Sequence, residues 1–177
     1  MKKTLLLILS LILAIGISGG CTPEKTPPKE DEIPPVVDTP VASEEYNEIV
    51  SLYFAKDNIN SLSVEKRTIA YKTKDDFYKN VIVELVKGPA TDSLSATINP
   101  NTVVSSVSVN NKTATADFTD SLKAFNTGGS TKEYMCLYSI VNTLCEFPEI
   151  DNVRLTITGK AIQTFGQLDT SEPLTKE

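Results

Sequence analysis

The residues in this chain with the widest range of chemistry are two carboxylates in its second half. Asp117 and Asp120 stand three residues apart, and paired carboxylates can act as general acid and base or bind a cation. The chain contains no histidine, which excludes Ser-His and Cys-His nucleophiles and ordinary imidazole zinc sites. Alternation along a strand points Asp117 away from the face of Phe118. We therefore expect both aspartates at a solvated strand end, capping a helix or turn.

Three further acidic residues, Glu146, Glu149 and Asp151, surround Pro148. They follow the end of a predicted helix, where negative charge is mildly unfavourable, and we interpret them as exposed polar residues. A cell-wall enzyme would need Glu146 to converge with the two aspartates in one cleft, because acid and base must reach the same substrate. We expect no catalytic, cofactor-binding or metal-binding residue, and no cofactor.

Two cysteines, Cys136 and Cys145, lie on one predicted helix. Their spacing corresponds to about 13.5 Å of rise and about half a turn of rotation, so they cannot form a disulfide without unfolding the helix. Cys145 falls in the apolar stripe and is expected to be a small buried hydrophobe. Cys136 falls outside the stripe and is expected to be a free thiol or to be covered by another chain.

The helix that carries these cysteines is predicted to begin at Ser130 and to end before Pro148. Ser130 can act as the N-cap, and Glu133 three residues later completes a capping box. The apolar side chains fall within about 120° of arc, the width of a core-facing stripe: Tyr134, Leu137, Tyr138, Val141, Leu144 and Cys145. Apolar residues then alternate over 153–158, which predicts a strand, and Gly159-Lys160 turns into a last strand around Ile162.

Earlier in the chain, residues 48–54 and 67–71 are predicted strands, and 73–87 a helix capped by Thr73. Residues 102–109 and 112–118 are predicted to pair through the Asn110-Asn111 turn, which places Val107 opposite Ala114 and Val109 opposite Lys112. The element order is therefore β-β-α-β-β-α-β-β. We predict an α+β fold in which two helices pack on one face of a mostly antiparallel sheet.

The first twenty residues have the pattern of a signal peptide. Lys2 and Lys3 precede an apolar segment, residues 5–15, that reaches roughly half of the ~30 Å hydrocarbon core of a bilayer. Small residues then lead to Cys21, and this arrangement resembles the lipobox of bacterial lipoproteins, with Ser18 where that family usually has Leu. The resemblance implies a lipid on Cys21 and an anchor on the outer face of the cytoplasmic membrane. The alternative is an ordinary secretory signal with a chance cysteine.

Residues 21–45 are predicted to be an extended tether. They contain six prolines and, from Thr22 to Glu45, seven acidic against two basic residues, about −5 of the chain's net charge of −6. Residues 46–168 carry twelve Lys plus Arg against thirteen Asp plus Glu, so they lack the basic excess that nucleic-acid binding requires. Their length suits one core. We predict a single domain over 46–168 and a disordered tail over 169–177.

A series of segments in this domain carries a family resemblance. They are EKRTI from Glu65, VIVELVKGP from Val81, INPNTVV from Ile98, NNKTATADF from Asn110, TGGSTKEY from Thr127, and SIVNTLCEFPEIDNVRLTITGK from Ser139. In order and spacing they resemble the GerMN domain of sporulation and spore-germination lipoproteins. The resemblance implies a fold similar to ring-building motifs of secretion systems, and an assembly or scaffolding role. Arg67 matches the family's arginine, and we expect it to form a structural salt bridge.

Three hypotheses follow. The first is a non-enzymatic, lipid-anchored extracytoplasmic protein that contacts envelope or sporulation proteins, or the cell wall, in spore formation or germination. The second is an envelope module that binds peptidoglycan fragments or a small molecule through Tyr and Asn side chains. The third is a cell-wall enzyme.

The surface predicted from the helices gives little support for self-association. Few apolar residues lie outside the core-facing stripes: Met135, Ile140, Phe147 and Val83. A stable self-interface requires a contiguous apolar patch of several hundred Å², which these four residues are too few to form. We therefore predict that the isolated domain is monomeric at micromolar concentration.

Overall fold

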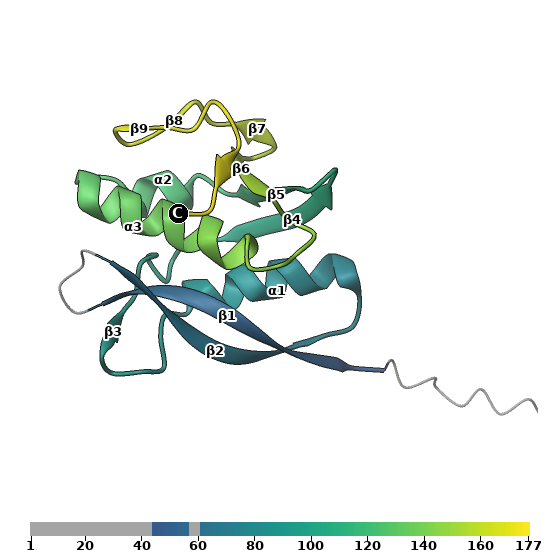
Figure 1. Ribbon diagram of the computed structural model, residues 1–177. Coiled ribbons are helices and arrows are strands. Elements are labelled where there is room, and N and C mark those ends of the chain that lie inside the picture. The colour runs from purple at the N-terminus through teal and green to yellow at the C-terminus, as the bar shows by residue number, and fades with distance from the viewer. Residues whose placement is uncertain (1–43, 57–60) are drawn as a thin grey trace, which may run out of the picture. The chain divides into compact units, whose positions relative to one another are not determined.

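The computed structural model describes residues 44–56 and 61–177, and this part of the chain begins with a long hairpin (Figure 1). β1 (Tyr46–Lys56) pairs antiparallel with β2 (Leu62–Tyr71), and β3 (Leu94–Ser95) pairs with the end of β1. Side chains alternate along β1, so Leu52 and Phe54 are buried while Ile49 is 68% exposed. One face of this first sheet therefore covers the core.

The second sheet is mixed. It contains β4 (Val104–Asn110), β5 (Thr113–Phe118), β6 (Asn152–Ile157) and β10 (Leu174–Thr175), with the short β7 (Lys160–Ala161) paired to β6. β5 and β6 are parallel because α2 (Ser121–Asn126) and α3 (Ser130–Leu144) form the crossover between them. β8 (Thr164–Phe165) and β9 (Leu168–Asp169) form a separate hairpin.

The helix predicted over 73–87 is confirmed as α1 (Lys74–Val86). The Thr73 hydroxyl accepts a hydrogen bond from the Asp76 amide at 3.2 Å, which caps the first turn. The buried side chains are those of the predicted apolar face: Phe77, Val81, Ile82, Leu85 and Val86. α1 contacts β1 and β2 of the first sheet and β4 of the second, so it lies between the two sheets (Figure 1).

α3 also lies between the sheets, in contact with β1 and β6 (Figure 1). Because both sides are covered, Met135 and Ile140, with Phe147 just beyond the helix, are buried rather than exposed on its flanks as expected. The predicted start also needs correction. The N-cap is Gly129, Ser130 is the first helical residue, and the Glu133 carboxylate accepts the free amides of the loop.

Two predicted turns are shifted by one residue. β4 and β5 turn at Asn111-Lys112, both with positive φ (46° and 63°), so Val107 faces Ala116 instead of Ala114. The Lys112 carbonyl accepts the Asp151 amide at 2.8 Å, which holds that residue in the turn. The hairpin after β6 turns at Thr158-Gly159, φ 50° and 76°, rather than at Gly159-Lys160. Both are the two-residue turns that suit the twist of a hairpin.

The α+β class and the predicted order of the main strands and helices are confirmed, with α2 and several short strands in addition. The strands are divided between two main sheets. The segment 169–177, predicted to be a disordered tail, is instead ordered: β10 pairs with β6, and Leu174 packs against the core. Its single apolar residue gave no periodic signal. The predicted signal peptide, Cys21 and nearly all of the predicted tether lie outside the described residues.

Candidate functional site

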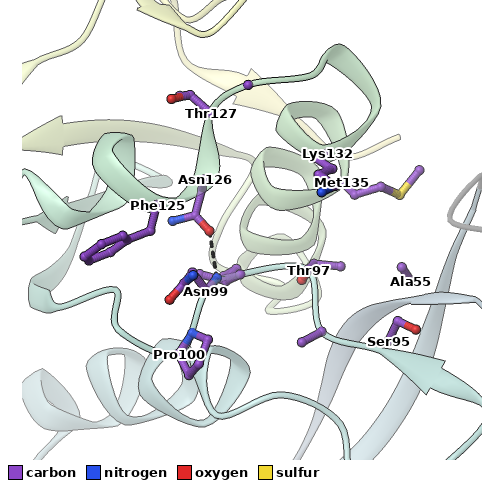
Figure 2. Close-up of a pocket in the computed structure, with 13 residues that line it drawn as sticks. Ala55, Ser95, Thr97, Asn99, Pro100, Phe125, Asn126, Thr127, Lys132 and Met135 are labelled. Carbon is purple, nitrogen blue, oxygen red and sulfur yellow. Dashed lines mark hydrogen bonds between the residues drawn. The ribbon is translucent and has the colours of Figure 1, made fainter.

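A cavity of about 390 Å³ lies between the loop 95–100 and the turn from α2 to α3 (Figure 2). The loop contributes Thr97, Asn99 and Pro100, and the helices contribute Phe125 and Lys132 among others. We call this space the docking cavity, after the partner binding that we propose for it below. Its lining comes from segments that are distant in sequence, so its shape depends on the contacts that join them.

Asn126 at the end of α2 makes the principal connection. Its side-chain oxygen accepts the Asn99 amide at 2.7 Å, and its side-chain nitrogen donates to the Thr102 hydroxyl at 2.8 Å and to the Leu122 carbonyl at 2.9 Å. Figure 2 shows Asn126 pointing at Asn99 across the cavity wall. The residue is only 8% exposed, so these bonds are shielded from water. The loop is therefore held firmly to α2.

Glu133 holds the other wall, the first turn of α3. Its side chain is 3% exposed and accepts the amides of Gly128 at 2.9 Å, Gln167 at 3.1 Å and Gly129 at 3.4 Å. The hydrogen bond from Gly128, followed by those from Gln167 and Gly129, keeps the pKa of Glu133 below its ordinary value despite burial. Gly166 has φ of 60° and leaves no space for a side chain, since a Cβ there would lie 1.9 Å from Glu133 Cδ.

The lining combines an exposed aromatic residue with one charge. Phe125 is 49% exposed, and Lys132 is the charged residue among the described lining residues. The Thr97 hydroxyl is buried without a hydrogen-bond partner in the described part of the chain. Among the described residues that line the cavity, none is an acid or a cysteine, so the lining offers no carboxylate pair and no thiol nucleophile.

A neighbouring hollow of about 480 Å³ shares Pro100 with the docking cavity. It is lined mainly by aliphatic side chains, including the exposed Val103, and its charged lining residue is Lys87. The two hollows therefore form neighbouring parts of one surface that combines exposed apolar side chains with lysines.

The two aspartates are placed as expected at strand and helix ends. Asp117 accepts hydrogen bonds from the Thr156 hydroxyl at 2.6 Å and from the Gly159 amide at 2.8 Å, so it secures the turn after β6. Asp120 is the N-cap residue of α2, although its side chain makes no capping hydrogen bond. Neither residue lines the docking cavity.

The acidic residues around Pro148 are engaged separately. Glu146 accepts the Tyr53 hydroxyl at 2.7 Å and pairs with Lys176, Glu149 accepts the Tyr78 hydroxyl, and Asp151 pairs with Lys112 at 3.1 Å. In residues 44–56 and 61–177, no group of three acidic or cysteine side chains is arranged to hold a metal ion.

The structural salt bridge predicted for Arg67 is confirmed. Its guanidinium pairs with Glu65 and Glu84 and donates to the carbonyls of Glu84 and Gly88, each at 3.1 Å. Burial raises the pKa of Glu65, but hydrogen bonds from Thr91, Ala90 and Arg67 outweigh it and lower that pKa to about 2. The cluster ties the end of α1 to β2.

Both cysteines are free, as expected from their spacing on the helix, but the expected burial of the two is reversed. Cys136 is fully buried, and burial raises the pKa of its thiol to about 12, whereas Cys145 is partly exposed at the helix end. The cause is again that α3 is covered on both sides.

No signal in the sequence indicated Phe125 and Asn126, because the six residues of α2 are too few to show a periodic pattern.

None of the helices in the described part of the chain is both long and apolar enough to span a membrane. Comparison with curated proteins found no match. A family model described as Germane, sporulation and spore germination, matches residues 51–163.

Solved structures give similar folds. The tandem GerMN domains of the sporulation protein GerM from Bacillus subtilis are 25% identical, with a TM-score of 0.57, over 74% of this chain and 45% of that one. The first GerMN domain of the same protein is 24% identical, with a TM-score of 0.54, over 73% and 96%. A candidate lipoprotein from Clostridium perfringens is 18% identical, with a TM-score of 0.52, over 75% and 88%. This chain thus spans less than half of the tandem protein.

Proposed function

The chain belongs to the Germane family of sporulation and spore germination domains, and from this premise we propose that it is a non-enzymatic, lipid-anchored extracytoplasmic module that binds a partner protein in one of those processes. The anchor is Cys21, on the outer face of the cytoplasmic membrane. The contact surface is the docking cavity together with the hollow beside Val103.

The main support for this proposal is that Phe125 is exposed at a cavity whose walls are held by buried hydrogen bonds. Phe54, Phe118 and Phe165 are fully buried, whereas Phe125 is 49% exposed. An apolar ring left in water loses roughly 25 cal/mol per Å² of the stabilisation that burial would give. Aromatic side chains of this kind, on surfaces that need little ordering, supply most of the binding energy at protein interfaces.

The charge of the surface indicates the kind of partner. Lys132 lines the docking cavity, and none of the described lining residues there is acidic. Lys87 of the neighbouring hollow is already paired with Glu84, so Lys132 is the charge that a partner would meet. An acidic segment with an apolar side chain would complement both features. We therefore expect the partner to present such a segment, with its apolar side chain against Phe125.

The anchor is tested on the membrane form of the full chain. Intact mass or radiolabelled palmitate is expected to show acyl groups on Cys21, and Cys21→Ser is expected to release the protein from the membrane. A soluble wild-type product cleaved elsewhere would contradict the anchor while leaving the docking surface untouched.

The docking surface is tested by Phe125→Ala in the full chain, expressed in the source bacterium in place of the wild type. We expect at least a tenfold loss of heat-resistant spores or of germination rate, at unchanged protein level. The matched control is Ile49→Ala, because Ile49 is more exposed (68%) yet lies on β1, away from the cavity lining. Normal sporulation and germination of Phe125→Ala would show that this surface is not the docking site.

A further inference from the structure

A third hollow, of about 210 Å³, is lined by Tyr53 from β1 and by Tyr134, Tyr138 and Asn142 from α3. We call it the tyrosine groove, defined by these four residues. Tyr134 and Tyr138 pack against each other with ring centroids 4.5 Å apart, at 37° between the planes. All three tyrosines are half-buried, so parts of their rings are accessible from the groove.

Hydrogen-bonding groups lie at the margins of these rings. The Tyr53 hydroxyl donates to Glu146 at 2.7 Å, and Asn142 Oδ1 accepts the Glu177 amide at 3.1 Å. In the described part of the chain, Asn142 Nδ2 has no partner, so it remains a donor for a ligand. The groove thus combines apolar ring surface with polar atoms at its edges.

The charges beside the groove compensate each other. Lys176 pairs with Glu146, and its ammonium lies 5.3 Å from the centroid of the Tyr53 ring. Because the cation and the carboxylate neutralise one another, this surface lacks the excess of positive charge that a polyanion such as nucleic acid requires. Glu177 also lines the groove and adds one carboxylate, which can accept hydrogen bonds from hydroxyl or amide groups of a ligand. The ligand that fits has an apolar face and polar edges that carry hydrogen-bond donors.

Sugars have this combination, since a pyranose ring presents a face of C–H groups and a rim of hydroxyls. Tyrosine provides a rigid apolar face with a polar tip, and few of its torsions need to be ordered on binding. We propose that the tyrosine groove is a binding site for a neutral hexosamine glycan strand, with sugar rings against Tyr134 and Tyr138 and polar substituents on Asn142 and the Tyr53–Glu146 pair. This site adjoins the docking cavity at Met135, but it does not depend on the function proposed for that cavity.

The probe is the β-1,4-linked hexamer of N-acetylglucosamine, titrated into the full chain purified in detergent and followed by isothermal titration calorimetry. The expected result is saturable binding with a dissociation constant below about 1 mM. Tyr134→Ala and Tyr138→Ala are each expected to weaken binding at least about fivefold, because each removes an aromatic contact. Tyr134→Phe keeps the ring and is expected to stay within about threefold of the wild type.

Two controls separate this site from other surfaces. Tyr46→Ala removes a tyrosine that is 49% exposed at the start of β1. Phe125→Ala alters only the docking cavity. Neither change is expected to alter the affinity for the hexamer. Thermal unfolding of each variant identifies any that fails to fold, and the second tyrosine variant then decides.

Three outcomes would overturn the proposal. The first is the absence of saturable heat at several millimolar hexamer. The second is a loss of affinity for the hexamer in Tyr46→Ala that is as large as the loss in Tyr134→Ala. The third is binding that appears only after deletion of residues 22–43, since aromatic grooves also bind proline-rich segments and the groove would then belong to that segment.

Discussion

The docking cavity and the tyrosine groove both lie against α3, and Met135 lines both. Their walls are held in different ways. The cavity depends on Asn126 and Glu133, two buried polar side chains with three hydrogen bonds each. The groove depends on half-buried rings and a partly exposed ion pair. Buried polar contacts are expensive to break and fix one shape, whereas surface contacts contribute little to stability.

The largest expected effect of a change behind the cavity is that of Gly166→Ala. The new Cβ would lie 1.9 Å from Glu133 Cδ, at a backbone φ of 60°. Left-handed strain of about 1–2 kcal/mol and overpacking of about 1–3 kcal/mol combine to a loss of roughly 3 kcal/mol in the free energy of unfolding. Urea denaturation measures it. Gly159→Ala, where φ is also positive (76°) but a Cβ would meet nothing within 4 Å, is the control, and an equal loss there would remove Glu133 from the explanation.

Asn126→Ala is expected to lower the free energy of unfolding by about 2 kcal/mol, because the Asn99 amide and the Thr102 hydroxyl lose a buried partner. The Asn99 amide should also exchange faster with deuterium. Asn47→Ala, at an exposed position of β1, should stay within about 0.5 kcal/mol of the wild type. Unchanged exchange at Asn99 in Asn126→Ala would show that the loop is held by other contacts.

Acid pH should distinguish the two regions. Hydrogen bonds from Gly128, Gln167 and Gly129 lower the pKa of Glu133, and the hydrogen bond from Lys176, followed by that from Tyr53, lowers the pKa of Glu146. A carboxylate whose folded pKa is depressed stabilises the protein above its unfolded pKa, near 4.5, and this contribution is lost as pH falls through the folded value.

Unfolding free energies measured from pH 7 to pH 3 test this contrast. We expect Glu133→Gln to flatten the acid limb of the profile, because the amide cannot titrate. Glu146→Gln is expected to follow the wild-type profile closely, since its pair with Lys176 is partly exposed to solvent. Profiles that flatten equally in both variants would contradict the distinction between buried and surface contacts.

The smallest expected effect is that of Tyr53→Phe in the tyrosine groove. The change removes only the hydroxyl that donates to Glu146 and keeps the ring beneath Lys176. The free energy of unfolding is expected to change by less than about 0.5 kcal/mol, measured by urea denaturation. A loss near that of Asn126→Ala would mean that the groove is held as firmly as the cavity.

The two long helices show how far the sequence could predict this structure. The apolar face of α1 is predictable from the spacing of its residues, because its opposite face carries Lys79 and Glu84 and the pattern is visible within the helix itself. α3 has polar residues such as Ser139, Asn142 and Thr143 on the side away from its apolar stripe, yet these are buried too. Their burial depends on how the strands divide into two sheets, which no local pattern reports.

The candidate site could not be predicted from the sequence for the same reason. Asn126 and Asn99 are 27 residues apart and meet through one hydrogen bond to a backbone amide, and any amino acid other than proline supplies such an amide. The role of Arg67 was predictable because its charge requires a partner, and Glu65 lies two residues before it on β2 while Glu84 lies on the next helix, α1.

Site-specific photo-crosslinking in sporulating and germinating cells can show whether the cavity beside Phe125 docks a partner. A photoreactive phenylalanine analogue is placed at position 125 of the full chain, and in a second strain at position 49, whose native Ile49 is 68% exposed. We expect one discrete adduct from position 125, lost when excess protein with native Phe125 is co-expressed, and none from position 49. No adduct from position 125, or the same adducts from both positions, would contradict docking at this cavity.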